Sequence, residues 1–155
     1  MKKIIIVIFT LILCISLAAC DEAQNNLPAD GEVYTGYISL NGDTLNLDTF
    51  EIITLEDKSR MQELDLEETD MPDGYYFNAL NEMKSFVIDD NTEYIFFDTS
   101  NLFVDENAQD KEYNTTDKEE FYQFLYRGEE VPMKVPFEVK MKDGIAVTIK
   151  EIFVN

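Results

Sequence analysis

The chain has 155 residues, of which 12 are basic and 32 acidic, and its formal net charge is −20. Such a balance excludes nucleic-acid binding, because that binding depends on lysine and arginine side chains that neutralise phosphates. The chain has no histidine, which excludes Ser–His–acid and Cys–His catalysis and histidine-ligated metal sites. It also lacks the glycine-rich motifs of phosphate-loop and dinucleotide-binding proteins.

The N-terminus combines a basic start with an apolar run that ends at a cysteine. Lys2 and Lys3 precede the apolar residues 4–17, and Leu17-Ala18-Ala19-Cys20 follows. This pattern resembles the signal of bacterial lipoproteins. The resemblance implies cleavage between Ala19 and Cys20 and attachment of diacylglycerol to the Cys20 thiol. The alternatives are an ordinary secretory signal or a membrane helix, for which about 20 apolar residues are needed.

From this signal we expect three parts: a signal peptide at 1–19, a lipidated cysteine with a flexible tether at 20–30, and one domain at 31–155. The protein would lie on the outer face of a bacterial cell membrane, and membrane lipid would be its first partner. Two acyl chains, at about 0.8 kcal/mol for each buried CH₂, give a stable anchor. Cys14 would leave with the signal and Cys20 would carry lipid, so no free thiol would remain.

The first folded segment is predicted to be a β-hairpin. Asn41-Gly42 is a strong signal for a tight turn between residues 33–40 and 43–55. Apolar residues alternate along both stretches, as expected of half-buried strands. The alternation changes phase near Asp48-Thr49, which predicts a β-bulge there.

Further strands are predicted at residues 75–79, 85–89 and 93–98, which are short and aromatic or β-branched. A closing hairpin is predicted around Asp143-Gly144, where apolar residues alternate on both sides, with a phase change near Lys150-Glu151.

Two helices are predicted, at residues 59–64 and 117–127. In the second, Thr116 and Glu119 have the spacing of a capping box. Phe121, Phe124 and Leu125 form its apolar face, and Gly128 can end it.

This order of elements predicts a mainly β fold with one or two short helices. It suits a small, partly open β-barrel resembling the oligonucleotide/oligosaccharide-binding (OB) type, in which the second helix plugs one end. A two-layer α+β arrangement is the alternative.

Two segments of this domain carry a resemblance to a family. Residues 70–78 (DMPDGYYFN) and Pro136-Phe137-Glu138-Val139, together with the hairpin turn at Asp143-Gly144, are similar to segments of an uncharacterised group of small Gram-positive cell-surface lipoproteins. The Asn41-Gly42 hairpin fits the same group. The resemblance implies no activity, because none is assigned to the group.

The densest group of oxygen ligands lies between residues 105 and 117, where Asp105, Asn107 and Asp110 are weak candidates for binding calcium. Read as an EF-hand loop that starts at Asp105, the segment has Asp110 where glycine is needed and Thr116 where glutamate is needed. We therefore expect a solvated acidic loop, with no metal and no cofactor.

Asp73, Tyr75 and Tyr76 are weak candidates for ligand binding. They surround Gly74 in a Pro-x-Gly turn, so the two rings could face a ligand. A structural interpretation is favoured, in which Pro72 and Gly74 shape the turn and one tyrosine faces inward.

The expected function is a non-enzymatic binding or accessory module whose partner is an extracytoplasmic protein or a wall component. One alternative is a cell-surface glycan hydrolase that uses a carboxylate pair, which predicts a cleft with two carboxyl groups of separated pKa. The other is an extracellular calcium-binding protein.

Overall fold

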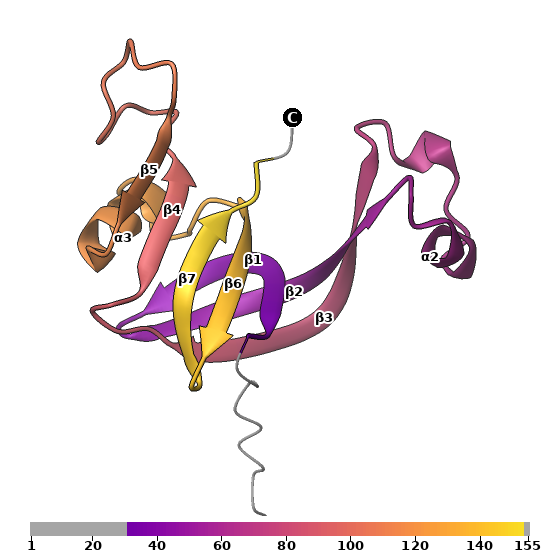
Figure 1. Ribbon diagram of the computed structural model, residues 1–155, viewed down its shortest axis with the longest axis horizontal. Helices are drawn as coiled ribbons and strands as arrows, with labels where there is room; N and C mark the ends of the chain where they lie inside the picture. Colours follow the sequence, from indigo (N-terminus) through magenta and orange to yellow (C-terminus); the bar gives the residue numbers. More distant parts are fainter. Residues whose placement is uncertain (1–30, 154–155) are drawn as a thin grey trace, which may run out of the picture.

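The computed structural model describes residues 31–153. They form seven strands, two α-helices and one short 3₁₀ helix (Figure 1). In chain order the elements are β1 (Val33–Asn41), β2 (Thr44–Thr54), α2 (Lys58–Glu63), η1 (Glu68–Asp70), β3 (Tyr75–Val87), β4 (Glu93–Phe97), β5 (Glu112–Thr115), α3 (Lys118–Tyr126), β6 (Pro136–Lys142) and β7 (Ile145–Glu151).

All seven strands belong to one strongly curved sheet with the order β3-β2-β1-β6-β7-β4-β5. A single parallel pair, Val87 with Ile145, joins β3 to β7 and bends five of the strands into a partial ring. The three-stranded meander β1–β3 and the hairpin β6–β7 thus share one curved sheet, while β4 and β5 extend it beyond the ring. The mainly β fold with two short helices is confirmed.

The β1–β2 hairpin forms where the sequence predicts it. Gly42 has the positive φ of +60° that the turn after Asn41 requires. Register between β2 and β3 shifts between Asp48 and Phe50, which confirms the predicted bulge. Gly36 in β1 permits a close approach of β2: a Cβ there would lie 2.5 Å from the carbonyl oxygen of Asp48 and 2.7 Å from Leu47 Cγ.

The structure corrects the prediction for residues 75–89. Instead of two short strands, one strand, β3, pairs with β2 from Tyr75 to Val87. Asn81 lies in its middle with φ +55°, so the bulge absorbs the polar residues that seemed to interrupt the strand. The strand β5 was not predicted at all, because its sequence, EYNT, has no apolar alternation.

The closing hairpin β6–β7 is also as predicted, but its phase change lies elsewhere. Register shifts between Lys140 and Met141, and not near Lys150-Glu151. As a result Ala146 and Ile149 are the fully buried residues of β7.

The N-cap of helix α3 lies one residue later than predicted. The N-cap is Asp117, whose carboxylate accepts a hydrogen bond from the backbone amide of Glu119 at 2.8 Å; Thr116 was the wrong residue. The helix ends at Arg127, which has a left-handed conformation, and Gly128 follows with φ +82°. Its buried residues include the predicted face.

The main core lies between the ring, β4 and α3, which Figure 1 shows on the side of the molecule away from α2. Phe121 of α3 stacks on Tyr94 of β4 at a centroid distance of 4.5 Å, and Phe124 stacks on Phe96 at 4.0 Å. The fully buried members include Leu45, Leu47, Tyr94, Phe96, Phe121, Leu125, Phe137, Val139, Met141 and Ile149. Aromatic stacking therefore fixes α3 on the sheet.

A second, smaller core lies at the far end of the β2–β3 ribbon, which extends from the ring as an arm (Figure 1). Ile53, Met61 and Met71 are buried there, under α2 and the loop that follows it. Arg60 of α2 holds the ribbon through hydrogen bonds to both carboxylate oxygens of Glu51, at 2.9 and 3.1 Å.

The predicted lipoprotein signal, including Ala19 and Cys20, lies outside the described residues. Within residues 31–153, no helix is both long and apolar enough to span a membrane.

Candidate functional site

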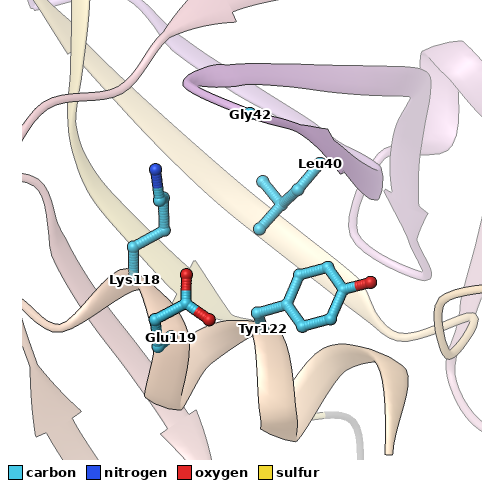
Figure 2. A pocket seen from close by; sticks show the side chains of 5 residues that line it. All are labelled: Leu40, Gly42, Lys118, Glu119 and Tyr122. Carbon is cyan, nitrogen blue, oxygen red and sulfur yellow. The ribbon is translucent and has the colours of Figure 1, made fainter. Parts of the chain in front are cut away.

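One hollow lies where the β1–β2 turn meets the start of α3. Leu40 and Gly42 face Lys118, Glu119 and Tyr122 across a cavity of about 250 Å³ (Figure 2). The predicted hairpin turn and the predicted second helix place these side chains, although the helix cap is Asp117 and not Thr116. It combines one cation, one carboxylate and one exposed aromatic ring.

The chemistry of this hollow is limited by the pairing of Lys118. Its ammonium forms an ion pair with Asp43 at 2.5 Å, and this hydrogen bond raises the pKa of Lys118 above its ordinary value. The side chain therefore stays protonated at neutral pH and is no nucleophile or base.

An acidic hollow of about 380 Å³ adjoins it, lined by Asp43, Asp89, Asp90, Asp117 and Lys118 among others. Yet no group of three or more carboxylates within residues 31–153 is arranged to hold a metal ion. Tyr94 lies beneath: burial, and then the carboxylates of Asp89 and Asp43, raise its pKa to about 12. Its hydroxyl is therefore neutral.

The candidate calcium residues lie in the loop between β4 and β5, where a lysine takes the central place. The ammonium of Lys111 donates to Asn101 Oδ1 at 2.6 Å and to the carbonyl oxygens of Asp105 and Glu106 at 2.7 and 3.1 Å. Asp105 Oδ1 accepts from the amide of Asn107 at 2.8 Å. The loop is thus ordered around its own cation.

Asp110 takes no part in that cluster. Its Oδ1 accepts from the backbone amide of Glu112 at 2.9 Å and so begins β5. The structure therefore does not bring Asp105, Asn107 and Asp110 together around one position that a calcium ion could occupy.

Asp73, Tyr75 and Tyr76 lie at the far end of the arm. The ring of Tyr75 contacts that of Phe77 in a tilted arrangement with centroids 5.1 Å apart, whereas Tyr76 is exposed on the opposite face of β3. Asp73 is exposed in the turn before Gly74, which has φ +83°. These residues shape the turn and the ribbon, and none of them lines a hollow described here.

A mainly apolar hollow, which we call the outer groove, lies on the meander. It measures about 300 Å³ and is lined by Tyr37, Ile38, Ser39, Asn46, Asp48, Met83 and residues 131–134. Tyr37 pairs with Asp48, and Asp48 with Met83, so all three lie on one face of the sheet. Their neighbours Ile38 and Leu47 are in the core, which places the groove on the face turned away from it.

The second wall of the outer groove is the loop between α3 and β6. The amide of Met133 donates to the carbonyl oxygen of Leu125 at 2.8 Å, which ties the loop to the end of α3. The ammonium of Lys134 lies 5.2 Å from the centre of the Tyr37 ring. Val131 and Met83 remain 75% and 63% exposed, so two large apolar side chains frame the opening.

The core-facing side of the same meander carries an inner hollow of about 350 Å³, lined by Val33, Tyr34, Thr35, Thr49, Phe50, Leu80, Glu82 and Lys84. Lys84 pairs with Glu82 at 2.9 Å and lies 4.9 Å from the centre of the Tyr34 ring. Strand β3 thus contributes to a hollow on each of its faces.

Two carboxyl groups in the core have shifted pKa values, but they are structural. Burial raises the pKa of Glu151, which accepts a hydrogen bond from the amide of Phe97 at 2.7 Å. Burial alone would also raise the pKa of Asp98. Hydrogen bonds from backbone amides, including that of Phe103 at 2.6 Å, outweigh this effect, and the pKa of Asp98 is lowered. Neither residue lines one of the hollows described above.

Sequence reasoning missed the outer groove. Tyr37, Met83 and Val131 come from three distant segments, and no local pattern connects them. The one available signal was the apolar Val-Pro-Met sequence at 131–133 in an otherwise charged stretch.

Comparison with known proteins found no matching family model, no similar curated protein and no similar solved structure.

Proposed function

We propose that the protein is a membrane-anchored lipoprotein on the outer face of a bacterial membrane, where it works as a non-enzymatic binding module for another extracytoplasmic protein. The anchoring part of the proposal rests on the sequence Leu17-Ala18-Ala19-Cys20. The binding part rests on one observation, the outer groove.

The groove supports a protein ligand more than a glycan of the cell wall. Its walls are mainly aliphatic, aromatic and thioether side chains, which bind other apolar side chains. Methionine side chains such as Met83 and Met133 adapt their shape to different partners. Exposed apolar residues on opposite sides of a groove are typical of interaction sites.

An enzymatic role has less support in the described residues. Lys118 is paired with Asp43, and the hydroxyl of Tyr94 is buried in the core. The shifted carboxyl groups Glu151 and Asp98 accept backbone hydrogen bonds. None of these groups lines the outer groove.

The anchor is tested with Cys20→Ala in the full chain. We expect the variant to leave the membrane fraction, since the acyl chains would have no attachment point. Unchanged membrane partitioning would exclude lipidation at this residue.

The binding role is tested by photo-crosslinking in bacterial cells that express the full chain. Val131 is replaced by p-benzoylphenylalanine, and the matched control carries the same group at Leu102, which is also exposed but lies away from the groove. We expect a protein adduct from position 131 that is absent from position 102 and is lost with Met83→Lys. No adduct, or equal adducts at both positions, would contradict the proposal.

A further inference from the structure

Strand β3 has a long open edge. On one side it pairs with β2 from Tyr75 to Ala79 and again from Met83 to Val87, on either side of the bulge. On its other side the only pair among the described residues is Val87 with Ile145. Backbone amides and carbonyls along the rest of this edge therefore face no neighbouring strand, and such an edge is a template for pairing with another chain (Figure 1).

Four exposed side chains of this strand are large and apolar, although its middle also carries the charged pair Glu82 and Lys84. Tyr76, Leu80, Met83 and Val87 are 37%, 46%, 63% and 54% exposed. Soluble proteins normally protect an edge strand with charges, prolines or a short length. Here the bulge at Asn81 divides the edge into two parts, which restricts the registers that a pairing chain can adopt.

Both faces of β3 adjoin a hollow. Met83 borders the outer groove on one face, and Leu80 and Lys84 border the inner hollow on the other. Side chains of an added strand point alternately to the two faces of a sheet. Successive side chains of a strand paired with β3 would therefore reach the two hollows in turn, which is how strand addition gains specificity.

The charge of the protein indicates what kind of chain can pair there. The net charge is −20, and Asp48 lies in the outer groove directly opposite Met83. Glu129 and Glu130 are exposed beside Val131, and together with Asp48 they outnumber Lys134, the cation in the wall of the outer groove. A second copy of this chain would bring the same negative charge to the edge, whereas a cationic segment would be attracted to it.

We propose that β3 binds an extended, positively charged peptide segment of another protein as an additional strand, with alternate side chains in the outer groove and the inner hollow. This inference rests on the proposed binding function and specifies its ligand. Backbone hydrogen bonds hold the segment on the edge, and its lysine or arginine residues give it charge complementarity.

The test uses the full chain in detergent micelles and a fluorescent peptide of alternating lysine and valine. One control is the same peptide with N-methyl groups on alternate residues, which removes backbone donors on one edge and keeps the side chains. The other control is the glutamate–valine peptide. We expect both control peptides to bind at least about tenfold more weakly than the lysine–valine peptide. The affinity of the lysine–valine peptide should fall as the salt concentration increases.

Two protein variants locate the binding. Leu80→Lys places a charge on the β3 edge, and Leu102→Lys makes the same change at an exposed residue that lines neither hollow. We expect Leu80→Lys to lower the affinity for the lysine–valine peptide by about tenfold. Leu102→Lys should lower it much less. Circular dichroism melting confirms that both variants fold.

Equal binding of the N-methylated peptide, or equal effects of the two variants, would overturn strand addition. So would a concentration-dependent dimer that buries β3, since the occupant would then be a second copy. If these results appear while the crosslink from position 131 persists, the binding function stands and only the strand mode fails. Loss of that crosslink removes the binding function itself.

Discussion

Tyr126 at the end of α3 and Leu40 at the end of β1 are joined by two hydrogen bonds across 86 positions of the chain. The phenol oxygen accepts from the amide of Leu40 at 3.0 Å, and its hydroxyl donates to the carbonyl oxygen of Leu40 at 3.3 Å. The side chain is buried. One residue thus closes the helix onto the first hairpin.

Tyr126→Phe keeps the ring and removes these bonds. We expect it to lower the free energy of unfolding by about 1 kcal/mol, because the backbone groups of Leu40 lose a part-buried partner. Chemical denaturation measures the loss, and Tyr122→Phe on the exposed side of the helix is the matched control. Equal stability of the two variants would show that the hydroxyl of Tyr126 contributes nothing.

Gly36→Ala is expected to destabilise the protein by about 3 kcal/mol, because its Cβ would overlap backbone as well as a core side chain. The backbone atom is the carbonyl oxygen of Asp48, at 2.5 Å from the added carbon. Ser39→Ala on the same strand serves as control, and thermal or urea unfolding measures both. A loss of stability in Gly36→Ala no larger than that in Ser39→Ala would mean that β1 and β2 move apart at this point without cost.

Glu151→Gln should stabilise the protein at neutral pH. Burial raises the pKa of Glu151 above its usual 4.5, so the folded state retains a proton that the unfolded state releases. The contribution of this residue is therefore fully present below pH 4.5 and decreases as the pH rises through the raised pKa. Glutamine resembles the protonated form and can still accept from Phe97.

The measurement is the melting temperature of Glu151→Gln against pH, with Glu138→Gln on the exposed face of β6 as the matched change of charge. The Glu151 variant should exceed the parent at pH 7 and converge with it near pH 4. A constant difference at every pH would show that burial of the charge is not its cause.

Lys111→Met should loosen the loop between β4 and β5, because three oxygen atoms would lose their shared donor. We expect faster proteolysis within residues 99–110 and a lower melting temperature, whereas Lys140→Met on the exposed face of β6 leaves both unchanged. Millimolar calcium should not raise the melting temperature of the parent chain, because the ammonium already occupies the centre of the loop. A calcium-dependent rise would contradict this account.

Local signals in the sequence predicted the elements that form from neighbouring residues. Asn41-Gly42 sets its turn through backbone conformation alone, and the aromatic face of α3 follows from helical spacing. The cap was misplaced by one residue because Thr116 and Asp117 are both good caps, and only the observed bond to Glu119 distinguishes them.

Non-local pairing explains what the sequence could not reveal. The middle of β3 is polar and exposed, and it is a strand only because β2 lies beside it. The outer groove needs β1, β3 and the loop before β6 to meet in space. The role of Lys111 could have been predicted from the sequence, since a lysine six residues from Asp105 in an acidic loop is a natural partner for the carbonyl oxygens of that loop.

The separate core of the arm should make the far ends of β2 and β3, together with α2, a cooperative unit of their own. Ile53, Met61 and Met71 pack with one another and not with the aromatic core of the ring. Amide protons of α2 should therefore exchange with solvent through a local opening that leaves the ring intact, on a shorter timescale than those of β6 and β7. The far end of the arm can unfold and refold while the rest of the domain keeps its shape.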